Sequence, residues 1–240
     1  AFNQMSESLE QIENLRHKLM IDVAHELRTP LTNIRGYLEA LSDGVLPPSS
    51  KTFSMLQDET LRIVQLVEDV LQLAKADAAH DNLTFENVDV VKMIHDIRHA
   101  YRSAFDERRL HVHMDMPSES VVVSADRNRL ARVFRNLADN AVRYTPPAGN
   151  VMVRVEPGPG MIRICFKNPA EGLTAKDMPY LFERFFRGEK SRSRQHGGAG
   201  IGLAIVKELI EAHKGTVEAE LQDGHLFICV ELPRISHQKP

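Results

Sequence analysis

The sequence predicts an α+β protein in which a helical hairpin precedes an α/β sandwich. Two observations support this fold class. Through the first 79 residues, apolar side chains recur at alternating three- and four-residue steps, the pattern of an amphipathic helix with a coiled-coil-like seam. Beyond residue 82, short β-branched runs alternate with amphipathic stretches, which is typical of a mixed sheet covered by helices on one face. A chain of 240 residues is long enough for each part to bury a core.

The helical part is predicted to fold as an antiparallel hairpin. Gly44, Pro47 and Pro48 end the first helix, and a serine caps the second. Two such helices bury too little apolar surface alone, so their stripes should pair with a second copy in a homodimer, as a four-helix bundle. A plain dimerisation stalk is part of this interpretation. The apolar seam consists of Met5, Leu9, Ile12, Leu19, Val23, Leu56, Ile63, Leu66, Val70 and Leu73.

The second part is predicted to begin after residues 78–82, where the composition changes. Its helices are expected at Val91–Phe105, Asn128–Tyr144 and Ile201–Ala212. Its strands are expected at Leu83–Val88, Leu110–Met114, Val121–Ser124, Val151–Val155, Met161–Phe166, Thr216–Leu221 and Leu226–Leu232.

Composition excludes several classes of protein. A net charge of −3 gives no bulk attraction to nucleic acid, and none is expected as a partner. No stretch reaches the roughly 18 apolar residues of a membrane span, and no signal peptide opens the chain. Cys165 and Cys229 lie in apolar runs 64 residues apart and are expected to be reduced core residues of a cytosolic fold. The chain begins without Met inside a helical pattern, as a fragment of a longer protein would.

The first motif with chemical potential is His25-Glu26-Leu27-Arg28-Thr29-Pro30 in the first helix. A histidine that attacks phosphorus must be accessible and partly neutral, as imidazole is near pH 7. Glu26 can accept the proton from the ring. Thr29 lies one turn further on the same face and could orient a water, while Pro30 predicts a kink beside the histidine. A lone helix histidine is more often an ordinary solvated or core residue, so His25 needs independent support.

That support comes from two distant motifs. Asn136 and Asn140 are four residues apart on one helix, and carboxamide oxygens on one face suit Mg²⁺. Arg143 and Tyr144 add a cation and an aromatic ring at the end of that helix. The run Gly197-Gly198-Ala199-Gly200-Ile201-Gly202 opens a later helix, where main-chain N–H groups can approach phosphates. Taken alone, the Asn pair could equally be two surface residues of a helix, and the glycine run could be a flexible hinge.

A polar, basic segment, residues 187–194, precedes the glycine run and has no apolar periodicity. It is either a solvated loop or a mobile lid whose cations screen a triphosphate.

Taken in order, these motifs resemble those of the sensor histidine kinases of two-component systems. His25–Pro30 is similar to the family's H box and Asn136–Pro146 to its N box. Leu181–Arg187 resembles the F box, and Gly197–Ile205 resembles the G2 box. The resemblance covers nearly the whole chain, and residues 1–15 are similar to the end of a HAMP signalling module.

The resemblance implies a domain order and a chemistry. Residues 16–80 would be the dimerisation and histidine phosphotransfer domain, and residues 81–240 an ATP-binding domain of the histidine-kinase and Hsp90-like type. His25 would be phosphorylated by ATP and would pass the phosphoryl group to an aspartate of a response regulator, with Glu26 as acid/base and Thr29 serving a phosphatase reaction. The full-length protein would be anchored in the membrane, with this part on its cytoplasmic side.

The resemblance also implies roles in nucleotide binding. Asn140 would be the leading Mg²⁺ ligand, with Asn136 beside it. Phe182, Phe185 and Phe186 would anchor the lid or simply pack in the core. The remaining ATP-binding residues would be Arg143, Tyr144, Asn168, Gly172, Arg187, Gly198, Gly200, Ile201, Gly202 and Leu203.

One stretch departs from the family pattern. The G1 box usually reads D-x-G-x-G, whose Asp accepts a hydrogen bond from the adenine amino group, whereas this chain has Asn168-Pro169-Ala170-Glu171-Gly172. Asn168 can offer a carbonyl oxygen but no charge, and a neutral hydrogen bond is roughly half as strong. Weaker nucleotide affinity is therefore expected. This departure is what favours an alternative, a dimeric scaffold that mainly binds or dephosphorylates its regulator. A chaperone- or topoisomerase-type ATPase is a third possibility, and the helical hairpin counts against it.

Overall fold

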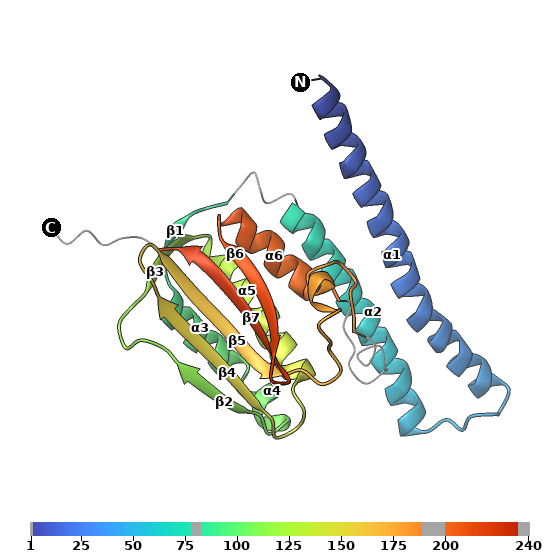
Figure 1. Cartoon of the computed structure of the whole chain (residues 1–240). Coiled ribbons are helices and arrows are strands. Elements are labelled where there is room, and N and C mark those ends of the chain that lie inside the picture. The colour runs from blue at the N-terminus through green and yellow to red at the C-terminus, as the bar shows by residue number, and fades with distance from the viewer. Residues whose placement is uncertain (1, 78–82, 189–199, 235–240) are drawn as a thin grey trace. The chain divides into compact units, whose positions relative to one another are not determined.

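The computed structural model describes residues 2–77, 83–188 and 200–234. Of residues 2–19, 69 and 72–77 it describes the main chain only. The chain divides into two compact units, with the division at Leu71 (Figure 1). No described helix is long and apolar enough to cross a membrane.

The first unit is the predicted helical hairpin. Helix α1 spans Phe2–Ser42 and continues through Pro30, and helix α2 spans Ser50–Asp77. Between them Gly44 adopts a positive φ of 71°, which glycine tolerates without strain. Ser49 caps α2, since its hydroxyl accepts a hydrogen bond of 3.2 Å from the main-chain N–H of Thr52. The kink predicted at Pro30 stays a prediction.

The hairpin exposes large apolar side chains on both helices. Met20 is 59% exposed and Phe53 58% exposed, whereas the fully packed Leu66 is only 4% exposed. Isolated apolar residues on a surface are ordinary, but a series along two facing helices suits a second copy. The others that remain exposed are Ile21, Leu31, Leu38, Leu61, Val64, Val67 and Leu71.

The second unit is a sandwich of one sheet and one layer of helices (Figure 1). Its five-stranded sheet has the order β2-β4-β5-β7-β6, in which β2 and β4 are parallel and the other neighbours are antiparallel. Strands β1 (Glu86–Asp89) and β3 (Val122–Ala125) form a separate antiparallel pair. The sheet strands are β2 (His111–Asp115), β4 (Asn150–Pro157), β5 (Met161–Pro169), β6 (Thr216–Gln222) and β7 (His225–Pro233).

The helices cover one face of this sheet and form the core with it. They are α3 (Val90–Ala100), α4 (Arg102–Glu107), α5 (Arg127–Tyr144) and α6 (Gly202–Ala212). Alternate residues of β5, such as Ile162 and Ile164, are fully buried against them. Phe134 of α5 stacks on Phe166 of β5, with ring centroids 6.5 Å apart. The predicted fold class is confirmed.

The single helix predicted over Val91–Phe105 is interrupted at Tyr101, which separates α3 from α4. The interruption lets the Tyr101 side chain turn toward α5, while Phe105 packs in a cluster with Leu110, Ala141 and Val151. Burial of these two aromatic rings outweighs the continuity of one helix.

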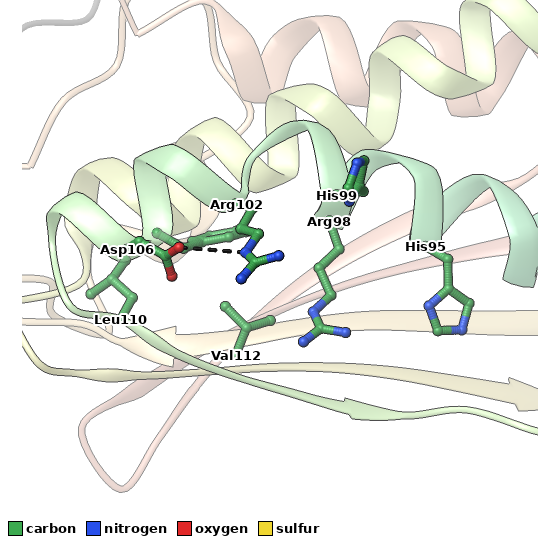
Figure 2. A pocket seen from close by; sticks show the side chains of 8 residues that line it. His95, Arg98, His99, Arg102, Asp106, Leu110 and Val112 are labelled. Atoms are coloured by element: carbon green, nitrogen blue, oxygen red, sulfur yellow. Dashed lines mark ion pairs between the residues drawn. The ribbon is translucent and has the colours of Figure 1, made fainter.

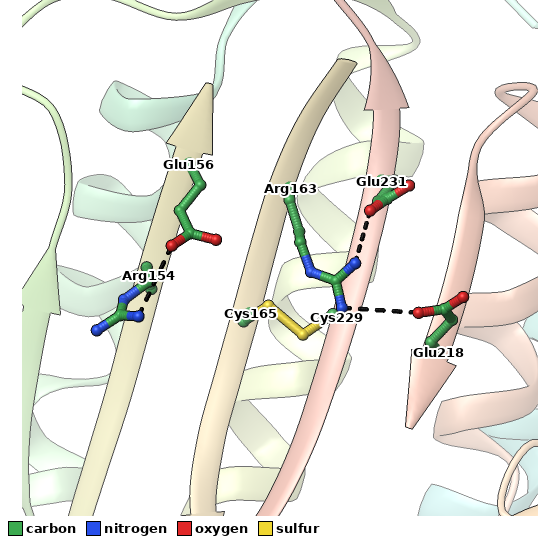
Figure 3. The surroundings of a disulfide bond; sticks show 7 residues. All are labelled: Arg154, Glu156, Arg163, Cys165, Glu218, Cys229 and Glu231. Carbon is green, nitrogen blue, oxygen red and sulfur yellow. Dashed lines mark hydrogen bonds and ion pairs between the residues drawn. A yellow bond between two sulfur atoms is a disulfide. The ribbon is translucent and has the colours of Figure 1, made fainter. Parts of the chain in front are cut away.

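The expectation of reduced cysteines is wrong in this structure, because Cys165 and Cys229 form a disulfide (Figure 3). They are register partners on the adjacent strands β5 and β7, with Cα atoms 4.1 Å apart. Directly opposed residues of an antiparallel pair bring their side chains together on one face. Their separation of 64 residues concealed this neighbourhood in the sequence.

Candidate active site

His25 lies on α1, well inside the helix, and its side chain is exposed. Glu26 is half-buried, Thr29 is exposed and Pro30 is buried. The imidazole is therefore accessible to a phosphoryl donor, and no hydrogen bond holds it to the described part of the chain. The helix therefore presents this histidine as a nucleophile must be presented.

The Asn pair lies on α5 with polar atoms that the fold itself does not satisfy. Nδ2 of Asn136 and Oδ1 of Asn140 are both buried and have no hydrogen-bond partner among the described residues. A buried, unpaired polar atom costs on the order of 1–3 kcal/mol, so two on one face of one helix point to a ligand. An oxygen ligand such as Oδ1 of Asn140 fits Mg²⁺. No cluster of three or more His, Cys, Asp or Glu residues within the described ranges offers another metal site.

The carboxyl end of α5 carries Arg143 and Tyr144, both half-buried, and is fixed by a residue that the sequence analysis missed. Arg108, just after α4, donates from Nη1 to the carbonyl of Arg143 at 3.3 Å and from Nη2 to the carbonyl of Thr145 at 2.9 Å. A guanidinium at this position satisfies carbonyls that the helix leaves open and complements its negative end. Arg108 thereby orients the end of the helix that presents Asn140 and Arg143.

Asp139, the residue before Asn140, meets Tyr101. Burial raises the pKa of the Tyr101 hydroxyl, and the negative charge of Asp139 and the hydrogen bond to it add to this effect. Burial likewise raises the pKa of the Asp139 carboxyl, while the hydrogen bond from Tyr101 and the charges of Arg143 and Arg135 oppose the rise. The contact ties α5 to the break between α3 and α4.

Asp139→Asn is expected to change stability in a pH-dependent way. A carboxyl whose pKa is raised by folding stabilises the protein only while it is protonated, and that stability is lost as pH rises from 3.8 through the raised value. At pH 8 the variant should therefore melt at the same temperature as wild type or slightly above it. The gain in the free energy of unfolding should be less than about 1 kcal/mol, because the residue keeps contact with solvent. The difference should shrink toward pH 4. Thermal unfolding followed by circular dichroism at several pH values measures this, and a wild type that is clearly more stable at pH 8 would contradict it.

The glycine loop meets the Asn helix at the start of α6. A Cβ on Gly202 would lie 3.9 Å from both Cγ and Oδ1 of Asn136. Helix α6 begins after Ile201 without a side-chain cap and has no acidic residue in its first turn. Its first N–H groups and the unpaired amide of Asn136 therefore occur side by side, and this combination suits a phosphate. Leu203, one residue further, is buried.

Gly200 joins the glycine loop to the phenylalanine motif. Its carbonyl accepts a hydrogen bond of 3.0 Å from the N–H of Phe185, and it has a φ of 71°. A Cβ there would lie 2.6 Å from the carbonyl oxygen of Phe186 and 2.9 Å from the carbonyl carbon of Phe185. The structure leaves no room for a side chain at this junction.

Gly200→Ala is expected to weaken the binding of a phosphate-bearing ligand such as ATP by tenfold or more, because the main chain of the loop or of Phe185–Phe186 must move. Gly224→Ala is the matched control, since Gly224 has a φ of 72° but a Cβ there would meet nothing within 4 Å. Both variants carry the same backbone strain, of order 1 kcal/mol, and only Gly200→Ala carries the clash. Titration with a fluorescent ATP analogue measures affinity; equal affinities for the two variants would refute the role of the clash.

The G1 segment lies at the end of β5. Asn168 is only 2% exposed, and its Nδ2 donates to the carbonyl of Pro169 at 2.9 Å, which leaves Oδ1 as the acceptor of the carboxamide. Gly172 has a φ of 90°, a conformation that favours glycine. A Cβ on Gly188, which follows Arg187, would lie 3.0 Å from Cδ2 of Leu173.

A chain of contacts thus runs from the Asn helix through the glycine loop and the phenylalanine motif to the G1 segment. Phe186 also packs against Tyr180, with ring centroids 6.0 Å apart. Arg184 of the same motif pairs with Glu208 of α6 at 3.3 Å. Gly198 and most of the basic segment 187–194 lie outside the described residues.

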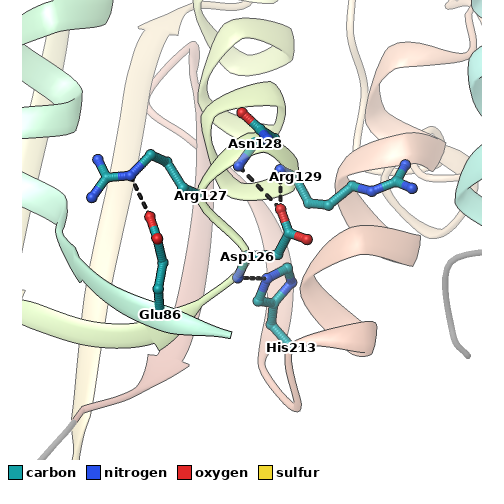
Figure 4. Close-up of polar contacts among 6 residues, drawn as sticks. All are labelled: Glu86, Asp126, Arg127, Asn128, Arg129 and His213. Atoms are coloured by element: carbon teal, nitrogen blue, oxygen red, sulfur yellow. Dashed lines mark hydrogen bonds and ion pairs between the residues drawn. The ribbon is translucent and has the colours of Figure 1, made fainter. Parts of the chain in front are cut away.

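A polar network around Asp126 and the buried His213 supports the other end of α5 (Figure 4). Asp126 caps the helix by accepting hydrogen bonds from the N–H groups of Asn128 and Arg129, each 3.1 Å long. Nε2 of His213 accepts the N–H of Asp126 at 3.0 Å, so its Nδ1 donates to the carbonyl of Leu209. An aspartate directly before an amphipathic run is a recognisable N-cap signal in a sequence, but no neighbouring residue indicates that His213 contacts it.

Comparison with known proteins agrees with this geometry. Residues 15–79 match the family model of the His Kinase A (phospho-acceptor) domain. Residues 125–235 match the model of the histidine kinase-, DNA gyrase B-, and HSP90-like ATPase. The first match contains His25, and the second contains the Asn helix, the G1 segment and the glycine loop.

Individual relatives give the same result. The chain is 37% identical over 233 residues to the signal transduction histidine-protein kinase BaeS of Escherichia coli, covering 97% of this chain and 50% of BaeS. It thus spans about half the length of this relative. Among solved structures, Acinetobacter baumannii histidine kinase AdeS superposes with a TM-score of 0.70 at 27% identity, covering 88% of this chain and 98% of that one. Histidine kinase ThkA, in complex with response regulator protein TrrA, shares the fold with a TM-score of 0.77 at 20% identity, covering 98% and 67% of the two chains. With a phosphoacceptor hairpin, an ATPase sandwich and these relatives, the chain belongs to the sensor histidine kinase family.

Proposed function

We propose that this chain catalyses the ATP-dependent phosphorylation of its own His25. A ring nitrogen of His25 would form a bond to the γ-phosphorus, the bond from that phosphorus to the β,γ-bridging oxygen would break, and ADP would leave. Glu26 would accept the proton that the ring releases. The observation that supports this best is the pair of buried, unsatisfied carboxamide atoms on Asn136 and Asn140 beside the uncapped start of α6.

Each residue of the candidate site has a role in this proposal. Asn140, with Asn136 beside it, would hold Mg²⁺, which supplies positive charge against the phosphate oxygens. Gly200, Gly202 and the first N–H groups of α6 would bind the phosphates. Arg143 and Arg187 would place cations near them, and Tyr144 would pack against the nucleotide. Asn168 would accept a hydrogen bond from the adenine amino group.

The partners follow from the same reaction. The phosphoryl group would pass from His25 to an aspartate of a response regulator, and the solved ThkA complex shows that a protein of this fold can bind one. Thr29, exposed one turn from His25, would orient a water for dephosphorylation of that regulator. The exposed apolar stripes of α1 and α2 support a homodimer.

The domain arrangement belongs to the proposal as well. Residues 1–15 would end a HAMP module, residues 16–80 would form the phosphotransfer domain and residues 81–240 the catalytic domain. The longer protein would be anchored in a membrane with this part on the cytoplasmic side.

The proposal is tested by incubating the chain with γ-labelled ATP and Mg²⁺. Label that is lost in acid and retained in base identifies phosphohistidine. A chain that binds ATP without acquiring label would instead support the scaffold, in which the domain serves only to bind or dephosphorylate a regulator.

Asn168→Ala is expected to weaken nucleotide binding about fivefold, since one neutral hydrogen bond contributes about 1 kcal/mol. The KM for ATP should rise while the rate at saturating ATP stays near that of wild type, because adenine binding is the same before and during transfer. Steady-state kinetics with a parallel melting curve separates this from a loss of folding. An unchanged KM would remove Asn168 from the adenine site.

A further inference from the structure

Outside the candidate active site, the second unit has a basic groove between its helical layer and one edge of its sheet (Figure 2). The groove has a volume of about 590 Å³. Its basic side chains come from α3 and α4, and its floor is apolar. The lining residues are His95, Arg98, His99, Arg102, Phe105, Asp106, Leu110 and Val112.

The basic residues form a regular stripe. His95, Arg98 and His99 follow steps of three and one residues on α3, so they share one face of that helix, and Arg102 of α4 lines the same groove. All four are exposed, and Figure 2 shows His95, Arg98 and Arg102 extending toward β2.

The groove holds two permanently charged guanidinium groups, those of Arg98 and Arg102, and the charge of Arg98 is uncompensated. Arg98, His95 and His99 make no side-chain hydrogen bond or ion pair with the described residues. Arg102 pairs only with Asp106, at 3.6 Å, and both side chains are largely exposed, so this pair is weak. Asp106 is the one acidic residue in the lining. In a chain of net charge −3, this is a local excess of positive charge facing solvent.

The groove also borders an unpaired strand edge. Strand β2 pairs with β4 on one side, and no described strand pairs with its other side. The N–H of His111 bonds to the carbonyl of Gly149, on the β4 side. Because main-chain groups of a strand alternate in direction, those of Val112 and Met114 point to the open edge. Val112 also lines the groove. The open main-chain N–H and C=O groups of β2 therefore lie beside the arginine side chains of the groove.

We propose that this groove binds an extended acidic segment of a partner protein, which adds to the open edge of β2 and places its carboxylates beside Arg98 and Arg102. The stripe from His95 to Arg102 spans about 10 Å, much more than one carboxylate or phosphate group covers. An extended strand advances about 3.3 Å per residue, so three acidic side chains at alternate positions, on one face, cover that span. Strand addition supplies main-chain hydrogen bonds, and the charges supply specificity. This inference is independent of the proposed kinase reaction.

The test uses the whole chain and a fluorescein-labelled peptide of alternating Glu and Val, followed by fluorescence anisotropy. Wild type should bind this peptide and should not bind the same peptide with Lys in place of Glu. The double variant Arg98→Glu/Arg102→Glu should bind at least about tenfold more weakly. Lys92→Glu is the matched control, because Lys92 is exposed on α3 but lies outside the groove. The affinity of this variant for the peptide should stay within about twofold of wild type.

Two readouts make the result decisive. Melting curves and autophosphorylation should be unchanged in both variants, and Arg98→Gln/Arg102→Gln replaces the charge reversal if that variant unfolds. Hydrogen exchange at the amides of Val112 and Met114 should slow when the peptide binds. Failure of wild type to bind at millimolar peptide, or an equal loss in Lys92→Glu, would overturn the proposal. The proposal would also be overturned if tripolyphosphate displaced the peptide and hydrogen exchange at those two amides did not slow on peptide binding. That result would identify a site for small polyanions.

Discussion

His25→Gln is expected to abolish autophosphorylation while leaving ATP binding intact. Glutamine has a similar size and remains polar, so an exposed position on α1 should accept it with a change in stability of less than about 0.5 kcal/mol. It offers no nucleophilic ring nitrogen, so no phosphoryl group can be held there. Incorporation from γ-labelled ATP should fall to background, and titration with a fluorescent ATP analogue should give the wild-type affinity.

The matched control for this variant is His111→Gln. His111 is likewise exposed, but it lies on β2, a strand that carries no residue proposed for the reaction. Its label should equal that of wild type. Residual label on His25→Gln that survives base and is lost in acid would mean that another histidine is phosphorylated, and the assignment of His25 would be wrong.

Asn140→Ala is expected to reduce autophosphorylation on the order of 100-fold or more, since it removes the leading ligand proposed for Mg²⁺. Nucleotide affinity in wild type should increase when Mg²⁺ is added, and in the variant this increase should largely disappear. The comparison of titrations with Mg²⁺ and with a chelator therefore tests the metal role apart from the rate.

Stability distinguishes this role from a structural one. Oδ1 of Asn140 is buried without a partner, so its removal should leave the melting temperature unchanged or raise it slightly. Residues of a functional site often do not contribute to the stability of the fold. Replacing such a residue impairs function and leaves stability unchanged. Asn128→Ala is the control on the same helix, because Asn128 is exposed and should affect neither property. A large drop in melting temperature for Asn140→Ala, or a full rate, would contradict the proposal.

The parts of the protein that could be predicted from the sequence have local causes. The hairpin follows from a seam of apolar residues and from the Gly44–Pro48 break, and α5 from an aspartate cap followed by an amphipathic run. The Asn pair is legible because residues four apart on a helix must share a face. The glycine loop can be recognised in the sequence because it directly precedes a helix, whose first N–H groups have no partner within the helix. Their order along the chain also pointed to His25.

Other features depended on which segments meet in space. Cys165 and Cys229 are neighbours only because β5 and β7 pair in one register, and shifting that register by one residue would place them on opposite faces. At the break between α3 and α4, the hydroxyl of Tyr101 meets Asp139, a residue of another helix. Arg108 and His213 brace α5 from 35 residues or more away along the chain.

The sequence by itself therefore determined most of the elements, their order and the residue types of the candidate active site. The tertiary structure decided which polar atoms remain unsatisfied, namely Nδ2 of Asn136 and Oδ1 of Asn140, and which cations near β2 remain unpaired. The physical reason is that periodicity and capping are short-range properties of a chain. Whether a buried or charged group has a partner depends on contacts between segments that only packing brings together.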